Sequence, residues 1–175
     1  MPTEISTSEK AELLNIANKI QRIRDFLSKH SLSTEGCDLI RWYDFLAQVK
    51  DLFGNFNNDL SFMATLLIKP YPGIAFDAAS KSQSAPGLDI DILTPDGKRI
   101  VGEVKTVYPY NETDFGSAQR ESFFQDFAKL AKAQADRKYL FLAEPRAFEV
   151  VQAKYRDGLG SVTVVSLTEG KEFKA

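Results

Sequence analysis

The stretch that decides the fold is residues 87–106, which read GLDIDILTPDGKRIVGEVKT. Apolar and polar residues alternate in both halves of this stretch, as they do in β-strands with two different faces. Between the halves stands Pro95-Asp96-Gly97. Proline favours the start of a type I turn, and glycine favours the left-handed residue that follows it. The stretch therefore predicts a β-hairpin with a three-residue loop.

The predicted hairpin gathers four ionisable side chains on one face. The loop would place Asp89 opposite Glu103. Because side chains alternate along a strand, Asp91 and Lys105 would lie on the same face as that pair. Three carboxylates on one patch repel each other, and one lysine cannot neutralise all of them. We therefore expect a cation at this site.

The expected cation is a hard divalent ion, Mg²⁺ or alternatively Mn²⁺, because such ions prefer oxygen ligands and two carboxylates leave positions for water and phosphate oxygens. An ion of this kind supports phosphodiester cleavage by activating water and offsetting negative charge. Lys105 would orient or deprotonate the attacking water or stabilise the developing charge, and the sequence does not separate these roles. The alternative is an ordinary half-exposed hairpin with a charged outer face.

An acid followed by a hairpin and then Glu-x-Lys resembles the motif of the PD-(D/E)xK nuclease superfamily, which includes many restriction endonucleases. The resemblance implies a catalytic set of Asp91, Glu103 and Lys105, with Asp91 about a dozen positions before the glutamate. It also implies that Asp91, Glu103 and Asp89 hold the metal, and Asp89 is the rival for the first acid. The proline-aspartate dipeptide of the motif is not intact, since two residues separate Pro86 from Asp89. In that family an acid from an earlier helix sometimes joins the site.

The rest of the chain predicts a single α/β domain over residues 1–175, with N-terminal helices over 1–70 and a mixed-sheet catalytic core over 71–167,. Helices are expected at 6–29, 38–53, 59–69, 117–137 and 145–156, and strands at 74–76, 88–93, 99–107, 139–143 and 161–167. The order from Asp59 to Ala143 is similar to the αβββαβ core of the restriction-endonuclease-like fold. Asp59 and Glu35 are the helix-region acids that could join the metal site.

The first helix carries an apolar seam and a clear start signal. Ser6 followed by Glu9 predicts a capping box,. The seam consists of Leu13, Ile16, Ile20, Ile23 and Leu27. A seam of this spacing can pair two chains in a coiled coil or pack on the domain's own core. The second helix carries so many apolar residues that we expect it to be mostly buried.

Composition restricts the chemistry. The chain has 175 residues and a net charge of −2, so any contact with nucleic acid must be local rather than spread over a basic surface,. The only cysteine, Cys37, allows no internal disulfide and fits a cytoplasmic protein,. The only histidine, His30, excludes mechanisms that need two or three imidazoles,. No apolar run approaches the length of a membrane span,.

Four polar side chains are candidates for contact with DNA. Lys81 and Gln83 lie in a predicted loop before the hairpin, where loop solubility explains them equally well,. Gln119 and Arg120 lie in the first turn of the helix after the motif. Gln119 with Phe123 faintly resembles the Gln-x-x-x-Tyr element of the exonuclease branch, with phenylalanine in place of tyrosine. Helix capping and core packing are the alternative explanation.

Together these observations predict a Mg²⁺-dependent endonuclease that cuts double-stranded DNA, in a type II restriction-like role and as a homodimer, because one such site cuts one strand. One alternative is a repair or recombination nuclease acting on branched or single-stranded DNA. The other is a non-catalytic DNA-binding module that retains the nuclease fold.

Overall fold

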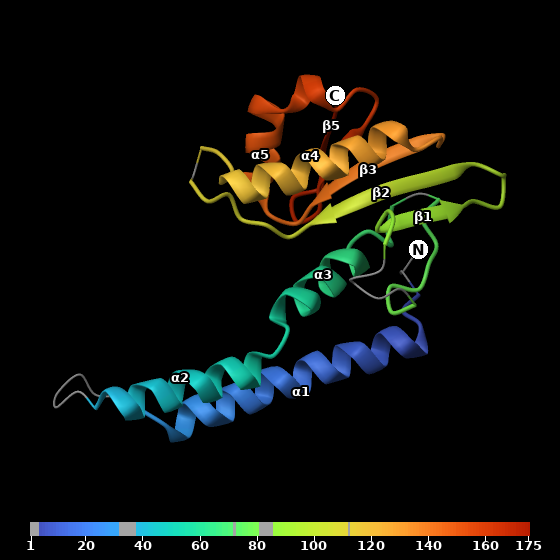
Figure 1. Cartoon of the computed structure of the whole chain (residues 1–175). Helices are drawn as coiled ribbons and strands as arrows, with labels where there is room; N and C mark the ends of the chain where they lie inside the picture. The colour runs from blue at the N-terminus through green and yellow to red at the C-terminus, as the bar shows by residue number, and fades with distance from the viewer. Residues whose placement is uncertain (1–3, 32–37, 72, 81–85, 112) are drawn as a thin grey trace.

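A five-stranded mixed sheet forms the centre of the molecule in the computed structural model, which describes residues 4–31, 38–71, 73–80, 86–111 and 113–175 (Figure 1). The strands are β1 (Ile90–Leu93), β2 (Arg99–Lys105), β3 (Arg137–Leu142), β4 (Thr163–Ser166) and β5 (Lys171–Lys174). They are ordered β1-β2-β3-β4-β5; the two outer pairs are antiparallel and the two inner pairs are parallel. The α/β class and the mixed sheet predicted from the sequence are confirmed.

Helices cover both faces of this sheet. On one face lie α4 (Ser117–Lys132) and α5 (Pro145–Lys154), which is followed by the short 3₁₀ helix η1 (Arg156–Gly158). They pack on a core that includes Val101, Leu130, Leu140, Val151 and Val164. On the other face the end of α3 (Phe56–Leu66) and the segment after it pack on Ile90, Ile100, Phe141 and Val165. Burial on both faces explains the continuous apolar runs at 139–142 of β3 and 164–165 of β4,.

The hairpin of β1 and β2 forms as the sequence predicts. Its register pairs Ile90 with Gly102 and Leu93 with Arg99. The three-residue loop is closed by a hydrogen bond from the Thr94 amide to the Lys98 carbonyl at 2.8 Å, and Gly97 takes a φ of 79°. Glycine adopts this left-handed conformation without the steric cost that a β-carbon brings.

The sheet differs from the prediction at both of its ends. The described residues 73–80 contain no strand, so the predicted strand at 74–76 is wrong and two strands, not three, separate α3 from α4. Ile74 is nevertheless buried, which explains its apolar character. β5, a short edge strand, was not predicted; it is anchored through Phe173, whose ring centroid lies 5.3 Å from that of Phe148. One apolar residue among three charged ones gives no strand signal.

The helix after the hairpin is shorter than predicted. α4 ends at Lys132, and Arg137 and Lys138 belong to β3 instead. The parallel pairing of β3 with β2 begins at Arg137, which lies opposite Ile100. Pairing with β2 therefore places Arg137 in a strand, although its local sequence pattern also fits a helix.

The N-terminal helices form a two-helix arm. α1 (Thr7–Lys29) and α2 (Leu39–Phe53) lie side by side and project away from the sheet (Figure 1). The capping box of Ser6 and Glu9 is present, as predicted, and Asp38 caps α2. None of the residues of α2, all of which the structure describes, is buried, so the expectation of a mostly buried second helix is wrong. The third helix begins three residues earlier than predicted, at Phe56.

Two ionic contacts attach the arm to the rest of the molecule. Glu9 is completely buried and accepts hydrogen bonds from Lys69 at 2.5 Å and from the Ala78 amide at 2.7 Å. Burial opposes ionisation of Glu9, but these bonds outweigh it and hold its pKa below the usual value. Lys19 of α1 pairs with Asp59 of α3 at 2.5 Å. Among the described residues, no helix combines the length and apolar character needed to cross a membrane.

Candidate functional site

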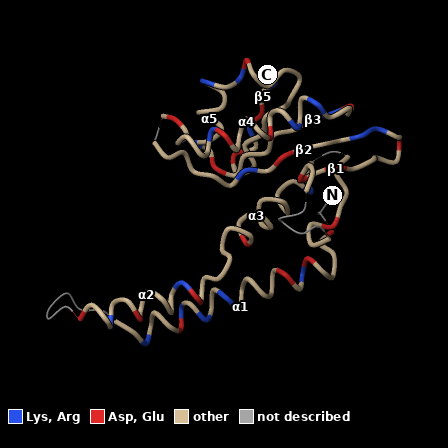
Figure 2. The backbone as a smooth tube through the Cα atoms, viewed as in Figure 1, with Lys and Arg blue, Asp and Glu red and all other residues tan. Residues whose placement is uncertain are grey.

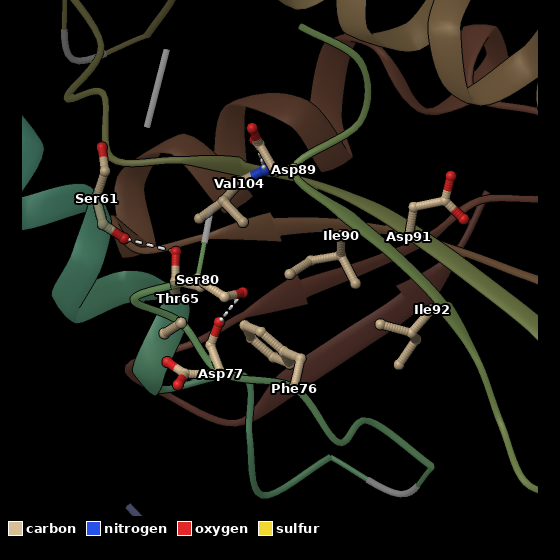
Figure 3. A pocket seen from close by; sticks show the side chains of 11 residues that line it. Ser61, Thr65, Phe76, Asp77, Ser80, Asp89, Ile90, Asp91, Ile92 and Val104 are labelled. Carbon is tan, nitrogen blue, oxygen red and sulfur yellow. Dashed lines mark hydrogen bonds between the residues drawn. The ribbon is translucent and has the colours of Figure 1, made fainter. Parts of the chain in front are cut away.

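The hairpin register brings Asp89 next to Glu103. One step beyond the pair Ile90–Gly102, these two residues are opposite each other, as the sequence predicts. One carboxylate oxygen of Asp89 accepts the amide hydrogen of Val104 at 2.8 Å, which fixes the side chain beside β2. Figure 3 shows Asp89 and Asp91 directed away from the side to which Ile90 and Ile92 point. The alternation inferred from the sequence therefore holds in the folded hairpin.

Glu103 is the most perturbed acid of the site. Its side chain lies beneath α4 and the residue is only 2% exposed. Burial, the hydrogen bond with Asp89 and the charges of Asp89 and Asp126 raise the pKa of Glu103 to about 8, although nearby Lys129 lowers it. Glu103 therefore keeps its proton at neutral pH, because two like charges this close are unfavourable,. The pair is therefore short of positive charge.

Lys105 does not contact Glu103 directly in this arrangement. Its ammonium group forms an ion pair with Asp126, donates a hydrogen bond to Ser122 at 2.7 Å and lies 5.4 Å from the centre of the Phe123 ring. All three partners belong to α4, so the expected motif lysine is held between strand and helix with its side chain only 13% exposed.

A second lysine, Lys129, contacts the acids instead. Lys129 of α4 lies 3.2 Å from Glu103 and 2.8 Å from Asp126, and these partners raise its pKa. The signal in the sequence is the row Ser122, Asp126 and Lys129, which follows helical spacing beside the buried row Phe123, Phe127 and Leu130,. A polar row beside a buried one indicates the edge of a helix that faces the sheet.

Asp91 is engaged elsewhere. Arg99 donates to both of its carboxylate oxygens, at 2.9 and 2.7 Å, and the register places Asp91 opposite Val101. A bidentate pair of this kind is a strong and geometrically specific contact. The structure therefore brings Asp89, which the sequence analysis treated as the rival, to Glu103, while Asp91 lies toward the turn.

Of the other residues predicted to contact DNA or the metal, only some lie in the described part of the chain. Gln119 organises the loop before α4: its carbonyl oxygen accepts the amides of Tyr110 and Gly116, and its amide donates to the Tyr108 carbonyl. Arg120 is half exposed and lies 3.9 Å from Asp114. Lys81, Gln83 and Glu35 lie outside the described residues, and Asp59 is paired with Lys19.

The site offers few oxygen donors for a divalent ion. Across the described residues, no group of three or more His, Cys, Asp or Glu side chains is arranged to hold a metal. The pair of Asp89 and Glu103 offers hard oxygen donors, and an ion there could replace the proton that Glu103 keeps. Mg²⁺ commonly uses one or two carboxylates and keeps several waters. The residues therefore fit a magnesium ion with two protein carboxylates and an otherwise open coordination sphere.

A cavity of about 250 Å³ lies on the opposite face of the hairpin (Figure 3). Its walls include Ser61 and Thr65 of α3 together with Phe76, Ile90 and Ile92. Asp89 and Asp91 also line this cavity, so it reaches the acids at the start of the hairpin, whereas Glu103 is not among its walls.

Charges of both signs are interspersed over the molecule. Figure 2 shows lysine and arginine alternating with aspartate and glutamate along α1 and α2, and no strand or helix carries one sign alone over a long stretch. A non-specific attraction to polyanions is therefore not a property of the described surface as a whole. Comparison of the chain with protein-family models, with curated proteins and with solved structures finds no match.

Proposed function

We propose that this chain is a Mg²⁺-dependent deoxyribonuclease whose metal ligands are Asp89 and Glu103. The observation that carries the proposal is the carboxyl pair itself: Glu103 is buried opposite Asp89 and has a pKa of about 8. Such a pair costs free energy unless a cation binds there, and strongly perturbed groups of this type are concentrated at functional sites. DNA as the substrate, and a restriction-endonuclease-like variant of the α/β fold, rest on the resemblance of the motif.

The chain's own residues have distinct tasks in this proposal. Asp89 and Glu103 hold the ion, which when bound supplies an activated water and offsets charge on the phosphate. Asp126 and Ser122 hold Lys105 in position. Lys129, which is 46% exposed at its side chain, is free of such enclosure and can turn from Glu103 toward a phosphate oxygen. Asp91 and Arg99 brace the hairpin.

The test is cleavage of supercoiled plasmid and of unmethylated phage DNA with Mg²⁺, Mn²⁺ or EDTA. We expect metal-dependent cleavage that Glu103→Gln and Asp89→Asn abolish. Asp91→Asn is the matched control, because it removes one charge from the same strand and should retain cleavage. Loss of cleavage in Asp91→Asn but not in Asp89→Asn would restore Asp91 as the principal ligand. Uncut DNA under all conditions would contradict the nuclease proposal.

A second candidate function is a non-catalytic DNA-binding module. It is favoured by the number of acids that already have cationic partners: Asp126 contacts Lys105 and Lys129, and Asp91 contacts Arg99. A module of this kind should bind a DNA duplex in EDTA and show no thermal stabilisation by Mg²⁺. Gel-shift and thermal-melting measurements separate it from the enzyme.

For the enzyme, we propose double-stranded DNA as the substrate and a homodimer as the active form, since cleavage of both strands needs two sites. Branched and single-stranded DNA are tested in the same assay. Preferential cleavage of a branched substrate would move the proposal to a repair or recombination nuclease.

A further inference from the structure

Each of the two helices of the arm carries two rows of mainly apolar residues, and among the described residues only one row of each helix packs against the other helix. The inner rows meet between the helices, where the rings of Phe26 and Phe45 lie 5.2 Å apart. The inner row of α1 is Ile16, Lys19, Ile23 and Phe26, and that of α2 is Trp42, Phe45, Val49 and Leu52; all eight are half-buried. The contact between α1 and α2 is therefore an ordinary helix pair with a narrow seam.

The outer rows follow one residue later in both helices. In α1 the outer row is Leu13, Ala17, Ile20, Arg24 and Leu27, and in α2 it is Leu39, Tyr43, Leu46, Lys50 and Phe53. The steps are four, three, four and three residues in each case, which is the spacing of a helix-packing seam. Neither row contains an acid, and each contains one cation.

The outer rows lie on the same side of the arm. One residue corresponds to a rotation of roughly 100° about the helix axis, so each outer row is turned by that angle from the inner row. α1 and α2 are antiparallel neighbours joined by a short connection (Figure 1). A rotation by 180° about an axis perpendicular to the plane of the two antiparallel helices exchanges them. Two rows that are turned in the same direction about their own helix axes therefore lie on the same side of that plane. The arm therefore has one continuous apolar face made by both helices.

This face is large and uncovered. Ile20, Leu27, Leu39, Tyr43 and Leu46 are between 50% and 77% exposed. Together they present on the order of 600 Å² of mainly apolar surface, at the upper limit for a monomer and close to the ~800 Å² that each partner contributes to a standard interface. Arg24 and Lys50 lie at the outer margin of the rows, where their stems can cover apolar surface while the charges reach water.

We propose that this face is the interface between two copies of the chain, which pack their arms into a four-helix bundle. The occupant is a second copy because an antiparallel helix pair with one apolar face is half of such a bundle, and an identical layer has matching length and row spacing. Three exposed acids of the arm, Asp25, Asp44 and Asp51, fall about 120° or more from the outer rows and remain in water. The inference does not depend on nuclease activity.

The test is the mass of the full-length protein in solution, measured by light scattering during gel filtration over a range of micromolar concentrations. We expect a dimer for the wild type and a monomer for Leu46→Glu and for Ile20→Glu. The matched controls are Gln48→Glu and Asn18→Glu, which place the same charge two residues away, off the outer rows, at exposed positions; both should stay dimeric. Circular dichroism of each variant shows whether the helices are retained.

Three outcomes would overturn the inference. The first is a monomeric wild type, including one that binds lipid vesicles instead of itself. The second is a wild-type dimer that persists in both outer-row variants, which would place the interface elsewhere. The third is equal dissociation by the outer-row and control variants, which would mean that the added charge alone separates the copies. Because the readout is mass, none of these depends on whether DNA is cut.

Discussion

At the scale of single residues, the site is defined by charges that lack enough partners. Glu103 is the clearest case, because its carboxyl group is buried against Asp89 and takes a proton that an exposed glutamate would lose. By contrast, hydrogen bonds from Lys98 to Asp96 and from Lys154 to Asp114 lower the pKa of each aspartate to about 2. Side-chain carboxyl groups of this chain thus titrate near pH 2 or near pH 8 according to their surroundings.

The raised pKa of Glu103 predicts that the metal-free protein loses stability as the pH rises. The unfolded glutamate titrates near 4.5 and the folded one near 8, so the stabilising contribution is fully present below 4.5 and is lost through pH 8. At about 1.4 kcal/mol per pK unit, the loss between pH 5 and 9 is up to about 4 kcal/mol. Urea denaturation in EDTA measures it.

Glu103→Gln is the control for this prediction, because a neutral amide should flatten the pH dependence. Asp96 and Asp114 do not interfere, since their lowered pKa values make their contributions constant above about pH 5,. A wild-type protein whose stability is constant or rises over this pH range would contradict the raised pKa of Glu103.

Lys105→Met tests whether this lysine braces α4 against the sheet. Asp126 is 5% exposed, and loss of one of its two cationic partners should destabilise the fold by about 2 kcal/mol,. Lys98→Met is the matched control: it breaks the solvent-exposed pair with Asp96 and should cost much less stability than Lys105→Met,. If chemical denaturation gave equal losses of stability for the two variants, the buried ion pair of Lys105 would contribute no more to stability than the exposed pair of Lys98.

At the scale of secondary-structure elements, the hairpin depends on close contact between β2 and β3. A β-carbon on Gly102 would lie 3.0 Å from the ring of Phe141, which is fully buried and cannot move aside. Glycine at this position lets β2 lie close to the Phe141 ring, so that Glu103 follows directly on the opposite face beneath α4.

Gly102→Ala should therefore destabilise the fold by about 1–3 kcal/mol, the usual cost of overpacking a core. Gly158→Ala is the control, because no atom lies within 4 Å of the added methyl group there and its φ is not positive. Thermal melting of both variants measures the difference. A neutral Gly102→Ala would show that the sheet relaxes easily around β2, and the position of Glu103 would then not depend on this contact.

At the scale of the whole molecule, binding of a divalent ion should appear as global stability, because a ligand that binds only the folded state stabilises it. With Ca²⁺ at about 100 times its dissociation constant, the gain is about 2.7 kcal/mol, or roughly 5–10 °C in melting temperature. Asp89→Asn should lose the gain and Asp91→Asn should keep it. A gain that survives Asp89→Asn would place the ion elsewhere.

The sequence by itself determined the elements whose signals are local. The hairpin over residues 87–106, its loop and the pairing of Asp89 with Glu103 follow from alternation and turn chemistry, which act within a few residues. The capping box at Ser6 and the helices that follow are local in the same way. Helix and turn preferences act on the unfolded chain as well, so they are visible without the fold.

Only the tertiary structure decided which charges meet. Lys129 contacts Glu103 across 26 residues of sequence, and Lys105 turns to Asp126 because α4 crosses above β2. Tertiary structure also decided that residues 74–76 form no strand and that the second helix is not buried. The apolar residues of both segments did not indicate which element they would pack against. The physical reason is that pattern fixes the face of an element, whereas the partner of that face depends on how distant elements pack together.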